Sequence, residues 1–201
     1  MPVLWINGPF GVGKTQAAYA LYALAFRLPG AFVCDPEQLG FGIQRMTPPE
    51  LRGDFQDTAL WRSGTRDLLA RSALHSNRFI IVPMTLVNPD YFDDIVGGLR
   101  RAGIEVRHAA LLASRETLLR RLRSRGEGAS SWGAEQIDRC LHGLAALDSA
   151  DHLATDGLTH HEVVDALARH SSLTLAPDPR TPLQRRRLDH LKVQLRSIRR
   201  D

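Results

Sequence analysis

The stretch NGPFGVGKTQ, residues 7–16, decides the fold of this chain. Gly8 is followed, after four residues, by Gly13, Lys14 and Thr15, and this spacing is typical of a loop that wraps phosphate groups. Glycine permits positive φ angles and a close approach of the backbone to a ligand, so successive N–H groups can point at phosphate oxygens. The sequence therefore predicts an anion-binding loop near the start of the chain.

The segments on either side of this loop support the prediction. Val3–Ile6 is a short apolar run of the kind found in buried parallel strands. The alanine-rich residues 14–28 predict a helix, whose N-terminal N–H groups and dipole favour a bound anion. A glycine-rich turn that binds nothing is the alternative, but the eight-residue spacing in this context favours the phosphate loop.

The residues of the loop have expected roles. Lys14 is expected to reach the β- and γ-phosphates of ATP, and the Thr15 hydroxyl to hold Mg²⁺. Only two of the 26 basic residues are lysines, and one of them stands where a compact ammonium suits phosphate better than a planar guanidinium. The loop residues expected to bind the nucleotide are Gly8, Pro9, Phe10, Gly11, Val12, Gly13, Lys14 and Thr15.

Apolar runs and helical patterns alternate along the rest of the chain, without an internal repeat. This alternation predicts βαβ units, and hence an α/β domain of the P-loop NTPase/kinase-like class over residues 1–171, with a parallel sheet and helices on both faces. The later strands are expected at 31–34, 79–82, 106–112 and 152–155. Helices are expected at 55–76, 89–101 and 134–147, after the capping residue Ser114, and after Thr159, which forms a capping box with Glu162.

Parallel strands end at one edge of a sheet, where ligands bind, so we expect Asn7, Asp35, Thr85 and Ala113 around one crevice. Asp35 could accept the proton of an attacking hydroxyl or hold Mg²⁺ through water, although it could equally cap the following helix. Thr85 is a candidate substrate contact, and it lies where many P-loop proteins carry an aspartate for the metal.

The acceptor site has three further candidates. Asp57, Trp61 and Arg62 lie about one helical turn apart and could line it together with Asp35 and Thr85. An Asp–Arg pair at this spacing is also common on a solvated helix face.

A cluster of arginines follows the strand expected at 106–112. Arg121 and Arg125 lie one helical turn apart and lead into a glycine-bearing loop, so they could act as a lid over the transferred phosphate, with Arg139 acting from the other side. All three are candidate nucleotide-binding residues, and an exposed basic face is the alternative. The candidate catalytic residues are Lys14, Asp35, Arg121 and Arg125.

The C-terminal segment is expected to form a separate unit. Residues 172–181 are expected to be a linker and 182–201 a basic amphipathic helix, because four apolar residues recur at three- and four-residue spacing among arginines. Residues 180–200 hold eight basic residues against one acidic residue, whereas the rest of the chain is net negative. This distribution argues against a nucleic-acid partner. The helix could lie on an anionic membrane surface or dock on its own domain.

Composition limits the remaining classes. A length of 201 residues fits one domain with an appendage. We expect no secretory signal, and no apolar run is long enough to cross a bilayer. Cys34 and Cys140 lack a metal-binding spacing and are expected to be reduced core residues. The protein is expected in the cytoplasm, either free or at the inner face of the membrane, and its oligomeric state stays open.

Four stretches, LWINGPFGVGKTQ, VCDPEQLGF, PMTLVNPDYF and SSWGAEQIDRC, together resemble the bacterial tunicamycin-resistance protein family of P-loop ATP-binding proteins. The resemblance runs from Trp5 to beyond Asp156 and resumes in the basic C-terminal helix. It implies ATP binding, resistance to a nucleoside antibiotic and peripheral membrane association. More distantly, the phosphate loop, Asp35 and the Arg121/Arg125 pair are similar to small-molecule kinases such as gluconate kinase and chloramphenicol phosphotransferase, which implies phosphoryl transfer to a hydroxyl with Asp35 as base.

These observations lead to two main hypotheses. The first is an ATP- and Mg²⁺-dependent phosphotransferase that acts on a hydroxyl of a nucleoside antibiotic, expected to be tunicamycin. The second is a nucleotide-dependent binding protein that sequesters the drug at the membrane without modifying it. An NTPase switch that acts on a protein partner is a third, weaker alternative.

Overall fold

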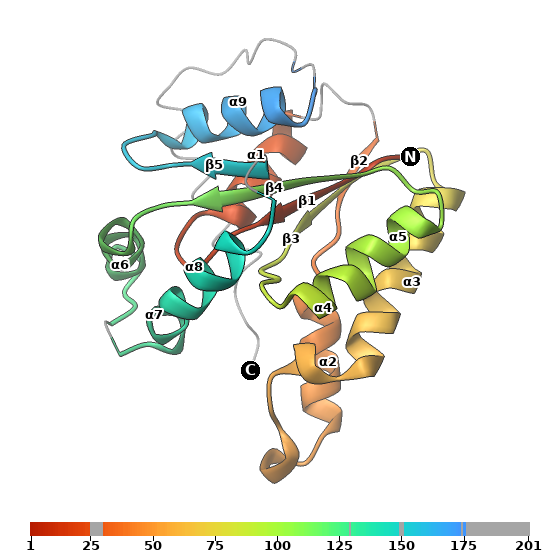
Figure 1. Ribbon diagram of the computed structural model, residues 1–201, viewed down its shortest axis with the longest axis horizontal. Helices are drawn as coiled ribbons and strands as arrows, with labels where there is room; N and C mark the ends of the chain where they lie inside the picture. The colour runs from red at the N-terminus through yellow and green to blue at the C-terminus, as the bar shows by residue number, and fades with distance from the viewer. Residues whose placement is uncertain (25–29, 129, 149–150, 174, 176–201) are drawn as a thin grey trace.

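The structure is a computed structural model that describes residues 1–24, 30–128, 130–148, 151–173 and 175. Over these residues, five parallel strands form one sheet in the order β2-β3-β1-β4-β5 (Figure 1). The predicted parallel α/β fold is confirmed. The predicted C-terminal helix lies outside the described residues. The strands are β1 (Val3–Asn7), β2 (Ala31–Val33), β3 (Phe79–Pro83), β4 (Val106–Leu112) and β5 (His152–Ala154).

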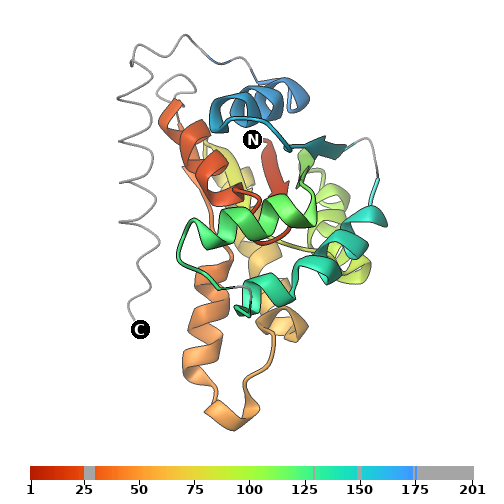
Figure 2. The same ribbon diagram turned by 90° about the vertical axis from the view of Figure 1, so that its left-hand side faces the viewer.

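Helices connect the strands and cover both faces of the sheet (Figure 1). Figure 2 shows α2 extending away from the body of the sheet. Among the described residues, every helix is too short or too polar to span a bilayer. The α-helices are α1 (Lys14–Leu24), α2 (Glu37–Met46), α3 (Ala59–His75), α4 (Pro89–Phe92), α5 (Gly98–Arg101), α6 (Arg115–Arg123), α7 (Trp132–Glu135), α8 (Ile137–Ala145) and α9 (His160–His170). Two 3₁₀ turns, η1 (Pro49–Leu51) and η2 (Phe55–Asp57), and a π-helical segment, η3 (Asp93–Gly97), complete the described elements.

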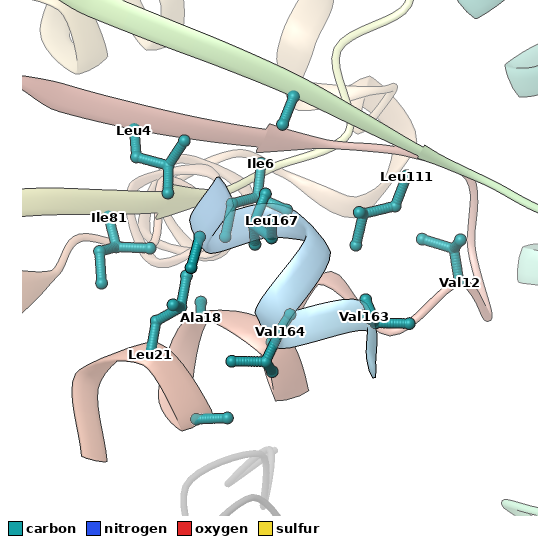
Figure 3. Packing of buried hydrophobic residues seen from close by; sticks show 14 of the residues in the cluster. Leu4, Ile6, Val12, Ala18, Leu21, Ile81, Leu111, Val163, Val164 and Leu167 are labelled. Atoms are coloured by element: carbon teal, nitrogen blue, oxygen red, sulfur yellow. The ribbon is translucent and has the colours of Figure 1, made fainter. Parts of the chain in front are cut away.

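The core forms because the central strand is apolar on both sides. Leu4 and Ile6 of β1 point to one face, where side chains of α1 and α9 cover them, including Val164 and Leu167 (Figure 3). Val3 and Trp5 alternate to the other face and belong to a cluster with residues of α3, η3 and α5. All five residues of β1 are buried. This double burial explains why β1 is a continuous apolar run.

Three expected helices differ in detail from the prediction. The helix expected at 55–76 is the short turn η2 followed by α3, because the Asp54 side chain accepts the Gln56 N–H and the backbone at Thr58 is extended. The one expected at 89–101 contains the π-helical segment η3. The one expected at 134–147 begins earlier and is divided into α7 and α8. The capping box of Thr159 and Glu162 is confirmed at the start of α9.

Candidate functional site

The phosphate loop joins β1 to α1 at the carboxyl edge of the sheet. The φ angles of Gly8, Gly11 and Gly13 are 143°, 82° and 103°, as their role in the loop requires. A Cβ atom on Gly8 would lie 2.6 Å from the Leu111 carbonyl oxygen of β4, so the loop also packs too closely for any other residue there. The carboxyl ends of β1 and β4 therefore fix where the loop begins.

Lys14 is the first residue of α1 and folds back into the loop. Its Nζ atom donates hydrogen bonds to the carbonyl oxygens of Gly8 (2.8 Å) and Pro9 (3.0 Å), and it lies 5.5 Å from the centroid of the Phe10 ring. Burial lowers the pKa of Lys14 to about 8, and the nearby charge of Glu37 opposes this change. A bound phosphate would give this ammonium an anionic partner and favour its charged form.

The side chains of the other loop residues differ in how far they are buried and in what they contact. Thr15 lies half-buried in the first turn of α1, next to Lys14. The side chain of Val12 is buried in the core below the loop and is not available to a ligand. The Phe10 ring packs against the Trp132 ring of α7, with centroids 4.9 Å apart. Trp132 is 57% exposed, and its position against the loop was missed by sequence reasoning because no spacing links it to Phe10.

Asp35 follows β2 and lies close enough to Lys14 for their charges to interact. Its Oδ1 atom accepts the Glu37 N–H at 3.0 Å, so Asp35 also supports the first turn of α2. Burial and the charge of Glu37 raise the pKa of Asp35 to about 6, against the opposing effects of that hydrogen bond and of Lys14. Both alternatives for Asp35 are therefore compatible: a helix-supporting acceptor and a carboxylate with the pKa of a general base.

Glu37 is a candidate that sequence reasoning missed. It is the first residue of α2, and its charge acts on both Lys14 and Asp35. Two acidic side chains therefore stand beside the phosphate loop. The signal that could have revealed Glu37 is its spacing, two residues after Asp35 at the end of a strand.

Thr85 is buried behind the loop and corrects the prediction of a substrate contact. Its side chain donates from Oγ1 to the Gly8 carbonyl at 2.9 Å, its own carbonyl accepts from Gln56 Nε2 at 3.0 Å, and only 4% of the residue is exposed. Ala113 is likewise buried in the core and does not face a crevice. Thr85 therefore holds the loop in place, and its burial keeps it away from an acceptor.

Trp61 also differs from the prediction. The residue is fully buried, so it cannot form the surface of an acceptor site. Its Nε1–H donates to the Pro36 carbonyl at 3.0 Å. Trp61 therefore supports, from behind, the segment that carries Asp35.

Asp57 and Arg62 do not pair with each other. Asp57 accepts a hydrogen bond from the Tyr91 hydroxyl (2.8 Å), and Arg62 lies 4.3 Å from the centroid of the same ring. Arg62 also pairs with Asp94 at 2.9 Å. The two residues thus join η2 and α3 to α4 and η3, and their contact with an acceptor stays a prediction.

The arginines occupy three different environments. Arg121 donates to the carbonyls of Val12 (3.3 Å) and Thr155 (2.8 Å), so here it braces the loop against the end of β5, and its role as a lid over the nucleotide stays a prediction. Arg125, just beyond α6, is exposed, and its charge lowers the pKa of Lys14, which indicates that it lies near the loop. Arg139 of α8 lies 3.8 Å from Asp54, on the side of η2.

A metal ion would find few protein ligands here. Among the described residues, no group of three or more histidine, cysteine or acidic side chains could hold one. The oxygen-bearing side chains beside the loop, Thr15, Asp35 and Glu37, suit Mg²⁺, which commonly takes one or two protein oxygens together with phosphate oxygens and water.

Comparison with known proteins gives consistent results. A family described as AAA domain matches residues 3–147, whereas comparison with curated protein sequences gives no match. The structure is similar to that of the Deinococcus radiodurans tunicamycin resistance protein, with a TM-score of 0.72 and 33% identity, over 88% of this chain and 99% of that chain.

Two kinases share the fold at lower identity. A gluconokinase from Sinorhizobium meliloti has a TM-score of 0.61 and 15% identity, over 98% of this chain and 97% of that one. The Mycobacterium tuberculosis APS kinase CysC, in complex with AMPPNP and APS, has a TM-score of 0.60 and 15% identity, over 85% of this chain and 97% of that one. At this identity the likeness concerns the fold.

Proposed function

This chain belongs to the AAA-domain family and to the family of tunicamycin resistance proteins, and from this premise we propose that it transfers the γ-phosphoryl group of ATP to a hydroxyl of tunicamycin. The observation that carries the proposal is the half-buried Lys14 inside a phosphate loop, with Asp35, whose pKa is about 6, beside it. A cation for the phosphates and a base for a hydroxyl are the two groups that this reaction requires.

The chemistry would proceed in one transfer step. The Asp35 carboxylate accepts the proton of the drug's hydroxyl, and the hydroxyl oxygen forms a bond to the γ-phosphorus. The bond between that phosphorus and the bridging oxygen breaks, and ADP leaves with the electron pair. Lys14 and the N–H groups of the loop would stabilise the negative charge on the phosphate oxygens, and Arg125, just beyond α6, would contribute a further positive charge.

When Mg²⁺ is bound together with ATP, it neutralises part of the negative charge of the phosphates. Thr15 would hold it directly, and Asp35 or Glu37 through water. These few oxygens fit an ion that the nucleotide's own phosphates largely coordinate.

The proposal is tested by incubating the protein with ATP, Mg²⁺ and tunicamycin and examining the drug by mass spectrometry. An added phosphoryl group is expected with the wild type. Asp35→Asn is expected to keep nucleotide binding and lose the product, whereas Asp67→Asn, an exposed residue of α3, is the matched control and should keep both. An unmodified drug, from protein that still makes cells resistant, would overturn phosphoryl transfer.

One observation favours the sequestration alternative. Thr85 has no carboxylate, and its hydroxyl is already bonded to Gly8, so the end of β3 offers no acidic metal ligand. If the protein only binds the drug, Asp35→Asn should leave resistance of cells intact while Lys14→Ala abolishes it. If it phosphorylates the drug, both substitutions should abolish resistance.

A further inference from the structure

The side chain of Asn7, the last residue of β1, lies directly behind the phosphate loop and is fully buried. Its Oδ1 atom accepts the N–H groups of Gly8 (2.8 Å) and Leu86 (2.9 Å), and its Nδ2 atom donates to the Leu86 carbonyl (2.7 Å). The same Nδ2 atom lies 3.3 Å from Nε2 of His108. All four hydrogen-bonding positions of the amide are thus used. Turning the amide over would bring its NH₂ group against two N–H donors, so its orientation is fixed.

This orientation determines the tautomer of His108. Because Asn7 Nδ2 is a donor, Nε2 of His108 must carry a lone pair, and the ring proton must sit on Nδ1. There it donates to Asp151 Oδ2, 2.7 Å away. The side chain of His108 is 1% exposed, and burial lowers its pKa, which favours this neutral ring even though Asp151 opposes the shift.

The other neighbours of His108 leave this arrangement undisturbed. The Phe92 ring contacts it edge-on at 4.8 Å, and Nε2 of His170 lies 2.9 Å from the His108 backbone carbonyl. The charges of Arg100 and His152 further disfavour a second proton on the ring. Hydrogen bonds therefore continue from Asp151 to His108, to Asn7 and to the Gly8 N–H.

Gly8 is held from both ends. Asn7 accepts from its N–H, while Thr85 and Lys14 donate to its carbonyl. These contacts hold the two peptide groups on either side of Gly8, and their planes set the direction in which the loop continues. We propose that His108, held by Asp151, is a positioning residue for nucleotide binding: its neutral Nε2 fixes Asn7, and Asn7 fixes the first residue of the phosphate loop. This inference rests on the nucleotide binding in the proposed function, but not on phosphoryl transfer.

Two substitutions of His108 distinguish a positioning role from a role in which the side chain only fills space in the core. In His108→Gln the side-chain amide reaches the place of Nε2 and can accept from Asn7. In His108→Asn the amide reaches only the place of Nδ1, so Asn7 loses its acceptor. Calorimetry with AMPPNP and Mg²⁺ at pH 8 should give affinity within about twofold of the wild type for the Gln variant. Affinity should be about tenfold weaker for the Asn variant, because an Asn7 side chain without its acceptor no longer holds the loop in the binding conformation before the nucleotide arrives.

The controls distinguish the possible failures. His75→Gln, at the exposed end of α3, should leave affinity unchanged. Equal affinities of the Gln and Asn variants, whether both normal or both weak, would overturn the positioning role. If His108→Asn does not fold, Asp151→Ala, which frees the ring from its Nδ1 partner, should still weaken AMPPNP binding, and unchanged binding would overturn the proposal. A wild type that does not bind AMPPNP would refute nucleotide binding itself, and this inference with it.

Discussion

Burial and the charge of Glu37 raise the pKa of Asp35 from 3.8 to about 6, so the folded chain holds this proton more tightly than the unfolded chain does. The ionised form is therefore disfavoured in the fold, and stability falls as the pH rises from about 4 to about 6. Asp35→Asn cannot ionise and keeps an acceptor for the Glu37 N–H. We expect it to raise the free energy of unfolding by about 2 kcal/mol at pH 8 and to leave it unchanged below pH 4.

Urea unfolding without ligand at both pH values measures this effect, with Asp67→Asn as the exposed control. If Asp35→Asn is less stable than the wild type at pH 8, the negative charge of Asp35 must be stabilised by its surroundings in the folded protein. The site would then lack the destabilised base that the proposed chemistry needs.

Lys14 gives a second prediction at the level of the residue. Because burial lowers its pKa to about 8, about half of the Lys14 side chains are neutral at pH 8. Bound phosphates favour the charged form, so nucleotide binding at pH 8 should take up as much as about half a proton, and far less at pH 7. Calorimetry in two buffers of different ionisation enthalpy measures the uptake. Equal binding enthalpies in both buffers at pH 8 would contradict it.

At the level of the element, α2 places Glu37 beside the loop and packs against η2 through a glycine. A Cβ atom on Gly40 would lie 2.5 Å from the Phe55 ring, whereas one on Gly42 in the same helix would meet nothing within 4 Å. We expect Gly42→Ala to stabilise the protein by about 0.5–1 kcal/mol and Gly40→Ala to destabilise it by about 1–3 kcal/mol through overpacking. Denaturant unfolding compares them, and a shift of the same sign in both would contradict the packing argument.

At the scale of the whole molecule, charge is distributed unevenly between the domain and the C-terminal segment of the sequence. Residues 180–200 hold eight basic residues against one acidic residue, whereas the rest of the chain is net negative. Deletion of residues 180–201 is expected to lower co-sedimentation with anionic vesicles at low salt, because basic residues near an anionic surface are attracted over about a Debye length. AMPPNP affinity of the shortened chain serves as the control for folding. Equal pelleting of both forms would favour a helix docked on its own domain.

Local signals were sufficient for the order of the elements. The strand expected at 106–112 has those bounds as β4, Asn88 caps α4 through its side chain, and Thr159 and Glu162 form the predicted capping box. Each of these features depends on neighbours within about four residues, so the sequence carries it directly. The π-helical segment η3 was missed, since the same apolar pattern also fits an ordinary α-helix.

The sequence by itself determined the phosphate loop, the alternation of strands and helices, and Asp35 at the end of a strand. Only the tertiary structure decided which side chains stand behind the loop and which beside it. Thr85 bonds to Gly8, Asn7 to His108, and Arg121 to the Val12 carbonyl, across 77, 101 and 109 positions of the chain. Such contacts depend on strand order and helix packing, which place distant residues together, and no local spacing contains that information.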